Sequence, residues 1–177
     1  MRGFTLFIDS EYRDRTQDAG LRKAPRTALD RGNTAPFDFR VELPSGQIEH
    51  VRCVELKGLS LPKARDCPFV YVDVNDWDNG FTTTCPSVGS AIGAVYFDSA
   101  QMAVGAVKPV KGADFTSKRV PFVPSLASFK DVRVRILKPD GTVLRKQDVT
   151  DEDDCTNVDP RVTLMLQVEV QTDMTDV

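Results

Sequence analysis

Alternation of apolar and polar residues is the clearest pattern along this chain. The segment FDFRVELP, residues 37–44, places four apolar side chains on one face and three charged side chains on the other. The segment RVTLMLQVEVQ, residues 161–171, places five apolar side chains on one face in the same way. A period of two residues is typical of a β-strand that buries one of its faces. We therefore predict a half-buried strand in each segment.

Further strands are predicted between these two. Residues 48–62 are rich in β-forming residues, and the phase of their apolar positions slips, as it does at a β-bulge. Short apolar runs predict strands at 69–74 and 91–97. Prolines interrupt two more candidates, at 103–110 and 120–123, and proline disfavours a central strand.

The segment DVRVRILKPDGTVLRKQ, residues 131–147, contains a turn signal between two apolar runs. Pro139 fixes a φ angle suited to a turn, and Gly141 allows a positive φ. The segment is therefore predicted to form a β-hairpin.

These patterns predict an all-β fold, because no helical period longer than about two turns is found. The 177 residues fit one domain. Long loops of uneven length favour a single jelly-roll β-sandwich of about eight antiparallel strands, although another Greek-key sandwich stays open. We assign the sandwich to residues 37–177. Residues 1–36 are predicted to form an irregular N-terminal arm, because residues 17–36 are polar and contain glycine and proline.

Composition argues against several classes of function. The formal net charge of −3 gives no bulk attraction to nucleic acid or to an anionic membrane. No apolar run is long enough to span a bilayer, and the first residues lack the pattern of a signal peptide. We expect no direct nucleic-acid contact, no membrane insertion and no export through a signal peptide.

Motifs for metal binding and catalysis are not recognisable. The four cysteines are far apart and form no C-x-x-C pair, so we expect no zinc site and reduced thiols. The single histidine, His50, could act as a general base for a nucleophilic serine, but the chain has no glycine-flanked serine of the kind such sites use. The chain also contains no glycine-rich phosphate-binding motif. We expect no catalytic residue, no metal and no cofactor, and therefore no enzyme. The cysteines are Cys53, Cys67, Cys85 and Cys155.

One loop offers an alternative function. The segment DVNDWDNGF, residues 73–81, gathers carboxylate and amide groups around the only tryptophan. Asp76, Trp77 and Asp78 could bind a sugar ring or calcium, as in a carbohydrate-binding module, but Asp78 stands where the EF-hand motif needs glycine. The bland interpretation is a tight turn capped by a partly buried aromatic side chain.

Other acidic groups point to no particular chemistry. The acidic segment DVTDEDD, residues 148–154, could collect a hard cation, although such a run is usually a solvated loop. A hydrolase with an unrecognised carboxylate pair also stays open, because no two of the 26 acidic residues stand out.

The opening segment IDSEYRDRT, residues 8–16, crowds charges of both signs behind an apolar run. Interleaved arginines lower the pKa of carboxylates, whereas a general acid near neutral pH needs a raised pKa. We therefore interpret the segment as an assembly element, and we expect TLFI, residues 5–8, to pair as an extra strand. Deletion of residues 1–16 is predicted to leave the sandwich folded. The candidate contacts are Asp9, Ser10, Arg13, Asp14 and Arg15.

The order of these signals resembles that of small virion proteins of large icosahedral nucleocytoplasmic DNA viruses of eukaryotes. In that family, an opening with aspartate-serine and arginine-aspartate precedes an alternating strand and a second strand that each end in Leu-Pro. A late hairpin and a strong last strand follow in both. The matching positions are Asp9, Ser10, Arg13, Asp14, Phe37, Phe39, Leu43, Pro44, Leu61 and Pro62.

The resemblance implies a structural capsid protein with a single jelly roll. The major capsid protein of such viruses is a much longer double jelly roll, so this length fits the penton protein that forms pentamers at the fivefold vertices. An internal minor capsid protein is the alternative. The implied partners are further copies of the chain, the major capsid protein and minor capsid proteins. The implied location is the virion capsid, assembled in the host cytoplasm.

Overall fold

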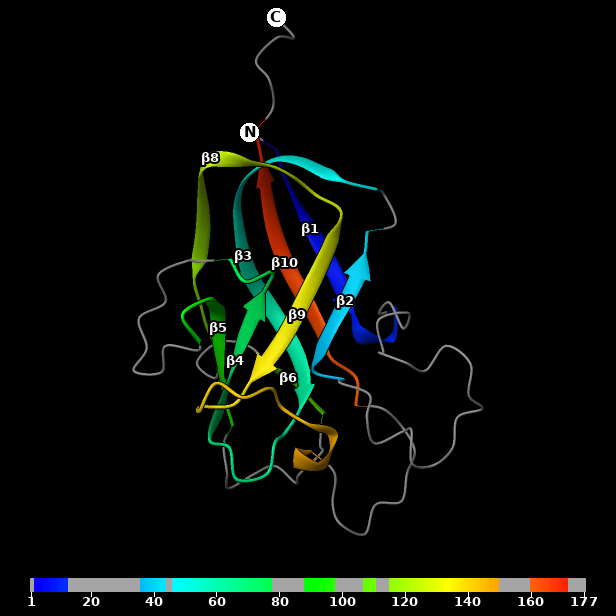
Figure 1. Cartoon of the computed structure of the whole chain (residues 1–177), viewed down its shortest axis with the longest axis vertical. Coiled ribbons are helices and arrows are strands. Elements are labelled where there is room, and N and C mark those ends of the chain that lie inside the picture. The colour runs from blue at the N-terminus through cyan, green and yellow to red at the C-terminus, as the bar shows by residue number, and fades with distance from the viewer. Residues whose placement is uncertain are drawn as a thin grey trace, which may run out of the picture.

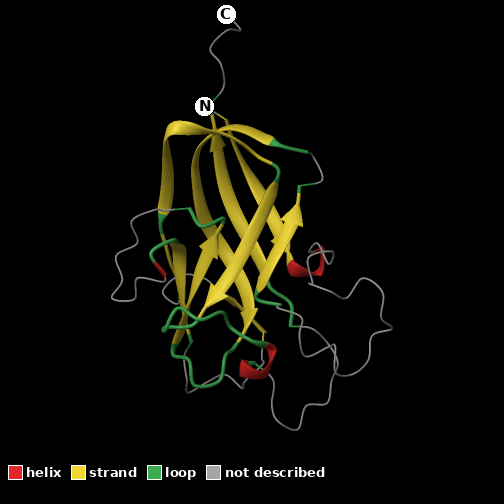
Figure 2. Cartoon of the chain, in the orientation of Figure 1, coloured by secondary structure: helices red, strands yellow, loops and turns green. Residues whose placement is uncertain are grey.

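The computed structural model describes residues 2–12, 36–43, 46–77, 88–97, 107–110, 115–149 and 160–171. These residues form an all-β sandwich of two antiparallel sheets, with two short 3-10 helices, η1 (Ser10–Tyr12) and η6 (Lys146–Asp148), as Figures 1 and 2 show. The strands are β1 (Arg2–Asp9), β2 (Asp38–Glu42), β3 (Ile48–Pro62), β4 (Phe69–Val74), β5 (Ala91–Tyr96), β6 (Val107–Val110), β7 (Phe115–Ser117), β8 (Arg119–Phe129), β9 (Asp131–Leu137) and β10 (Thr163–Val170).

The strands pair in a nested order. One sheet runs β1-β10-β3-β6, with β8 also on β3, and the other runs β2-β9-β4-β5-β7. Thus the first strand pairs with the last, the second with the ninth, the third with the eighth, and the fourth with the fifth. A long hairpin that rolls up across two sheets produces this nesting, which is the jelly roll. The predicted fold class is therefore confirmed.

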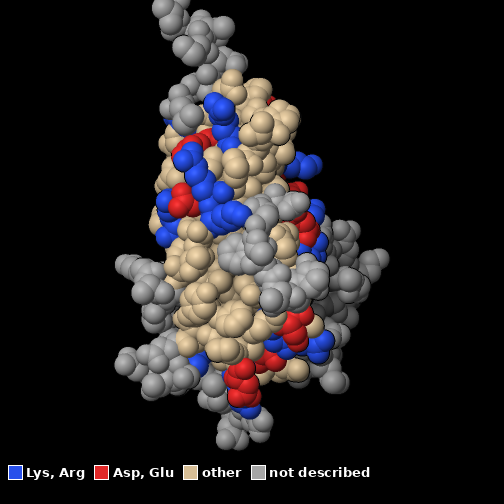
Figure 3. Space-filling model, turned by 90° about the vertical axis from the view of Figure 1, so that its left-hand side faces the viewer, with Lys and Arg blue, Asp and Glu red and all other residues tan. Residues whose placement is uncertain are grey.

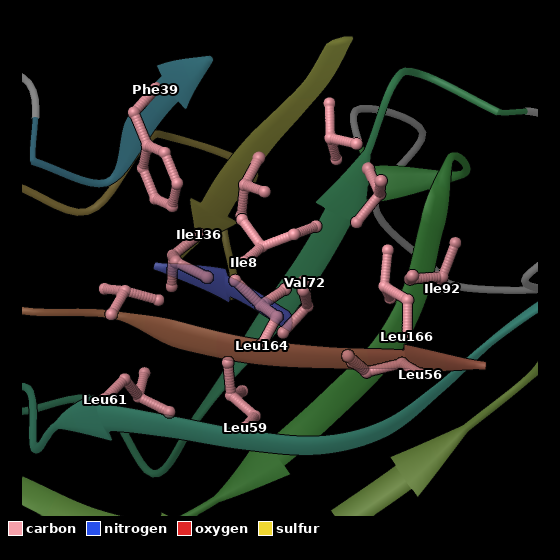
Figure 4. Packing of buried hydrophobic residues seen from close by; sticks show 14 of the residues in the cluster. Ile8, Phe39, Leu56, Leu59, Leu61, Val72, Ile92, Ile136, Leu164 and Leu166 are labelled. Atoms are coloured by element: carbon pink, nitrogen blue, oxygen red, sulfur yellow. The ribbon is translucent and has the colours of Figure 1, made fainter. Parts of the chain in front are cut away.

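The core lies between the two sheets, as Figure 4 shows. Alternate side chains of β10 and β2 point into it, as their sequence pattern predicts. The predicted irregularity of β3 is also present, because its register shifts both against β10 and against β8. Buried side chains that meet across the sheets include Leu56, Leu59, Leu61, Leu164 and Leu166 from one sheet and Phe39, Val72, Ile92 and Ile136 from the other.

The N-terminal boundary differs from the prediction in one respect. Residues 2–9, placed in the irregular arm, form β1 and pair with β10 along their whole length. The expected strand at TLFI is therefore longer than four residues, and it supplies the first strand of the roll. Ile8 is only 2% exposed within the core. Residues 13–35 of the arm lie outside the described residues.

Two further details correct the sequence interpretation. The predicted hairpin after β9 keeps its turn, but its return limb makes only one bridge, between Leu137 and Val143, before η6 begins. The proline-containing segment near residue 120 forms the eleven-residue strand β8, not a short one. β8 tolerates its prolines because it pairs only with β3, and no strand of the described residues lies on its other side.

Candidate functional site

The junction of β1, η1 and β10 contains the first predicted contact, Asp9. Arg161 Nε donates to both oxygens of the Asp9 carboxylate, at 3.0 Å each, and a second Arg161 nitrogen also binds this carboxylate. Glu11 shares the same guanidinium at 3.2 Å. The Arg161 hydrogen bond is the main reason why the pKa of Asp9 lies below its usual value. Asp9 thus makes an ion pair, and its partner belongs to the same chain.

Ser10 closes the same junction. Its hydroxyl oxygen accepts a hydrogen bond from the Val162 amide at 2.9 Å, and its own amide donates to the Val162 carbonyl at 2.9 Å. The side chain is buried. Ser10 therefore fastens the end of β1 to the start of β10. The other predicted contacts, Arg13, Asp14 and Arg15, lie outside the described residues.

The loop around Trp77 forms a tight turn in its described part. Asn75 and Asp76 both have positive φ, 56° and 51°, and the Trp77 amide donates to the Val74 carbonyl at 3.2 Å. Asparagine and aspartate tolerate this backbone region better than most residues do. The bland interpretation, an Asx-rich turn, therefore describes residues 74–77; Asp78 lies outside the described residues.

The ring of Trp77 is engaged by its own chain. It packs edge-on against Phe122 and Phe129 of β8, with ring centroids 5.3 and 5.7 Å apart. A sugar-binding tryptophan needs an open face on which the sugar can stack. Here the partly buried indole instead joins the turn to β8 and to the edge of the core.

Asp76 belongs to an ion-pair network on the outer face of the β2-β9-β4 sheet. Arg135 binds both Asp76 and Asp73, and Arg133 binds Asp38 through two hydrogen bonds of 2.9 Å. Asp73 is only 1% exposed, and burial raises its pKa above the usual value although Arg135 opposes this shift. The network holds three neighbouring strands in register, and it engages two carboxylates of the loop segment, Asp73 and Asp76.

The described cysteines and the histidine form no common site. Cys53 is buried and accepts a hydrogen bond from Arg119 Nε at 2.8 Å, and Cys67 is partly buried. Burial raises the pKa of both thiols, which makes them poor nucleophiles. His50 is only three residues from Cys53, but its side chain is exposed and its backbone has a positive φ of 53°. Among the described residues, no group of three metal-ligating side chains could hold an ion.

The structure also shows a groove that the sequence patterns did not indicate. It has a volume of about 630 Å³ and lies on the outer face of the sheet, where β1, β10 and β3 are neighbours. Phe7, Met165 and Gly58 occupy one row across these strands. Phe7 is 76% exposed, and Gly58 leaves space beside Met165. Two features of the sequence could have indicated this groove. Phe7 is an apolar residue on the outward face of β1, and Gly58 is a glycine within a strand. The groove suits an apolar contact.

Comparisons with known proteins give no family. No family model matches the chain, and no curated protein sequence matches it. Among solved structures, the Kashmir bee virus empty particle at acidic pH has 12% identity over 95% of this chain and 90% of that one, with a TM-score of 0.31. A CocE/NonD family hydrolase from Staphylococcus aureus has 11% identity over 94% of this chain and 32% of that one, with a TM-score of 0.23. Both scores are too low to support an argument about fold or function.

No described helix is long and apolar enough to cross a membrane.

Proposed function

We propose that this chain is a structural capsid protein of a large icosahedral double-stranded DNA virus. The observation that carries the proposal is the nested strand pairing, because the jelly roll is the recurrent fold of viral capsid domains. Lectin and cupin domains share this architecture, so the fold alone does not decide the function. The order of the sequence motifs in Asp9–Ser10, residues 37–44 and Leu61–Pro62 favours the capsid class.

The polar groups support a structural role. Asp9, Asp38, Asp73 and Asp76 are all paired with arginines, and these pairs connect segments that are distant in sequence. Catalytic carboxylates usually come in pairs whose environments push their pKa values apart for acid and base roles. The arginine-paired carboxylates on this sandwich instead fix the register of its strands.

Within the capsid, we propose the penton protein, which forms a ring of five at the vertex. A ring needs two different complementary surfaces on each subunit. Exposed apolar side chains occur at separate places: Val123, 91% exposed, lies where four residues of β8 bulge opposite one residue of β3, and Tyr96 lies on the other sheet. Figure 3 shows broad uncharged areas between small clusters of both charges on one side of the molecule. Such areas suit contacts with neighbouring copies, the major capsid protein and minor capsid proteins.

A map of the virus particle, obtained by electron cryomicroscopy, tests the proposal. The penton assignment predicts that this chain fits the density around the fivefold axes, with five copies at each vertex. A fit beneath the capsomers would overturn the penton assignment in favour of an internal minor capsid protein. If purified particles contained no copy of the chain, the capsid role itself would be refuted.

A further inference from the structure

The first strand leaves one edge of its sheet open. β1 pairs with β10 on one side only, and no described strand lies on its other side. An open edge presents unpaired backbone N–H and C=O groups that can bind another strand. β1 is eight residues long, contains no proline, and keeps a regular register with β10.

The other edge strands carry features that discourage pairing. β6 has four residues and includes a lysine and a proline, and β7 has only three residues. β2 carries three charged side chains in five residues. β8 contains two prolines and a bulge in which four of its residues lie opposite one residue of β3. Short length, charge, proline and bulges are the usual protection of an edge. Between its terminal residues β1 has none of these features, so its edge is suited to strand addition.

The two ends of β1 carry opposite charges. Arg2 is exposed at the first end and makes no ion pair in the described part of the chain. At the other end, Asp9 and Glu11 share the guanidinium of Arg161, so the described residues there carry one carboxylate more than they carry arginines. An antiparallel partner with the same sequence would bring each Arg2 close to the other copy's carboxylates. A parallel partner would place like charges together.

The side chains of β1 are also compatible with self-pairing. Gly3, Thr5 and Phe7 point outward, and Phe4, Leu6 and Ile8 point toward the core. When Thr5 lies opposite Thr5 of a second copy, inward residues meet inward residues on both chains. In this register Phe7 lies across from Gly3, which has no side chain of its own; the neighbouring group that the aromatic ring meets is the Gln167 amide, whose nitrogen is 3.1 Å from the position of a Cβ on Gly3.

We propose that β1 binds β1 of a second copy, antiparallel and about a twofold axis at Thr5, so that the two sheets become one continuous sheet. This contact goes beyond the proposed ring and does not depend on it. The ring would use other surfaces, and each contact can exist without the other.

A cysteine cross-link tests the proposed register. Thr5→Cys is introduced into a chain that carries Cys85→Ser and Cys155→Ser, and the protein is oxidised with oxidised glutathione. Residues directly opposite in an antiparallel pair have Cα atoms about 4.5–5.5 Å apart, which a disulfide can bridge. We expect a covalent dimer on a non-reducing gel. Arg2→Cys in the same background is the matched control, because Arg2 faces Ile8 and not itself.

A second substitution shows whether the open edge causes the cross-link. Phe7→Lys adds an edge-protecting charge at an exposed position, and it should reduce the rate of Thr5→Cys cross-linking about tenfold. Val123→Lys, on β8, should leave this rate unchanged. Equal cross-linking of Thr5→Cys and Arg2→Cys, or an unchanged rate with Phe7→Lys, would overturn the proposal. A chain that cross-links at Thr5 but forms no ring would refute only the penton assignment; a ring without the cross-link would refute only the β1 contact.

Discussion

At the scale of single residues, two aspartate–arginine pairs show how burial decides the importance of a charge. Asp73 is buried, with its partner Arg135 partly covered. The side chain of Asp9 is more accessible, and its partner Arg161 is more than half exposed. Water screens the second pair and hardly reaches the first. Removal of each arginine should therefore have a different effect on stability.

Arg135→Gln should lower the free energy of unfolding by about 3 kcal/mol, because it leaves the buried Asp73 carboxylate without its counter-charge. Arg161→Gln should lower the free energy of unfolding by much less, because water screens this exposed pair. Urea denaturation of both variants gives the comparison. The double variant Asp73→Asn with Arg135→Gln should recover most of the loss. Equal costs for the two single substitutions would contradict this account of burial.

The same two aspartates should respond to pH in opposite directions. Burial raises the pKa of Asp73, so only between about pH 3.9 and this raised pKa does the folded chain hold a proton that the unfolded chain has released. Relative to Asp73→Asn, the wild type should lose stability as the pH rises through the raised pKa. The pKa of Asp9 is lowered by Arg161, so the wild type should gain stability relative to Asp9→Asn as the pH rises toward about 3.9. Urea denaturation across this pH range measures both differences, and slopes of the same sign would contradict the assigned environments.

The interleaved arginines of the opening segment indicated a lowered pKa for its carboxylates, but they did not indicate that Arg161 is the partner of Asp9. Arg161 is 152 positions away in sequence, and only the pairing of β1 with β10 brings the two together. The turn at residues 74–77 was predictable from local preferences, because asparagine and aspartate accept a positive φ. Local chemistry is thus accessible from sequence, whereas partners depend on topology.

At the scale of elements, the main difference concerns β1, which was predicted to be part of an N-terminal arm and is instead a strand of the sandwich. Its apolar residues do not alternate strictly, because Phe7 faces outward between the inward Leu6 and Ile8. Because the alternation is broken at Phe7, the sequence pattern did not predict a strand of eight residues. Deletion of residues 1–16 should therefore destabilise the sandwich, not leave it intact, since it removes Ile8 from the core and a whole strand from β10.

Two neighbouring substitutions test the role of β1. Ile8→Ala should lower the free energy of unfolding by about 2–5 kcal/mol, because it leaves a cavity in the core. Phe7→Ala removes a larger side chain from an exposed position and should change the free energy by less than about 0.5 kcal/mol. Chemical denaturation of the monomeric protein measures the free energy of unfolding of both variants. A similar loss in both variants would mean that β1 does not pack as described.

At the scale of the whole molecule, sequence patterning predicted two packed sheets but not their order. The alternation in residues 37–44 and 161–171 shows that each segment buries one face. It does not show that β10 lies between β1 and β3, because many strand orders would bury the same residues. The nested order comes from contacts between distant segments, and it is the basis of the proposed capsid role.

Native mass spectrometry of the purified chain tests the proposed ring most directly. The experiment uses the Phe7→Lys variant, in which the β1 contact is weakened, so that only the ring contact determines the number of chains. The penton assignment predicts a discrete species of five chains of 19.6 kDa each, which Val123→Lys should weaken. A single chain at every concentration, or a discrete species with another number of chains, would contradict it.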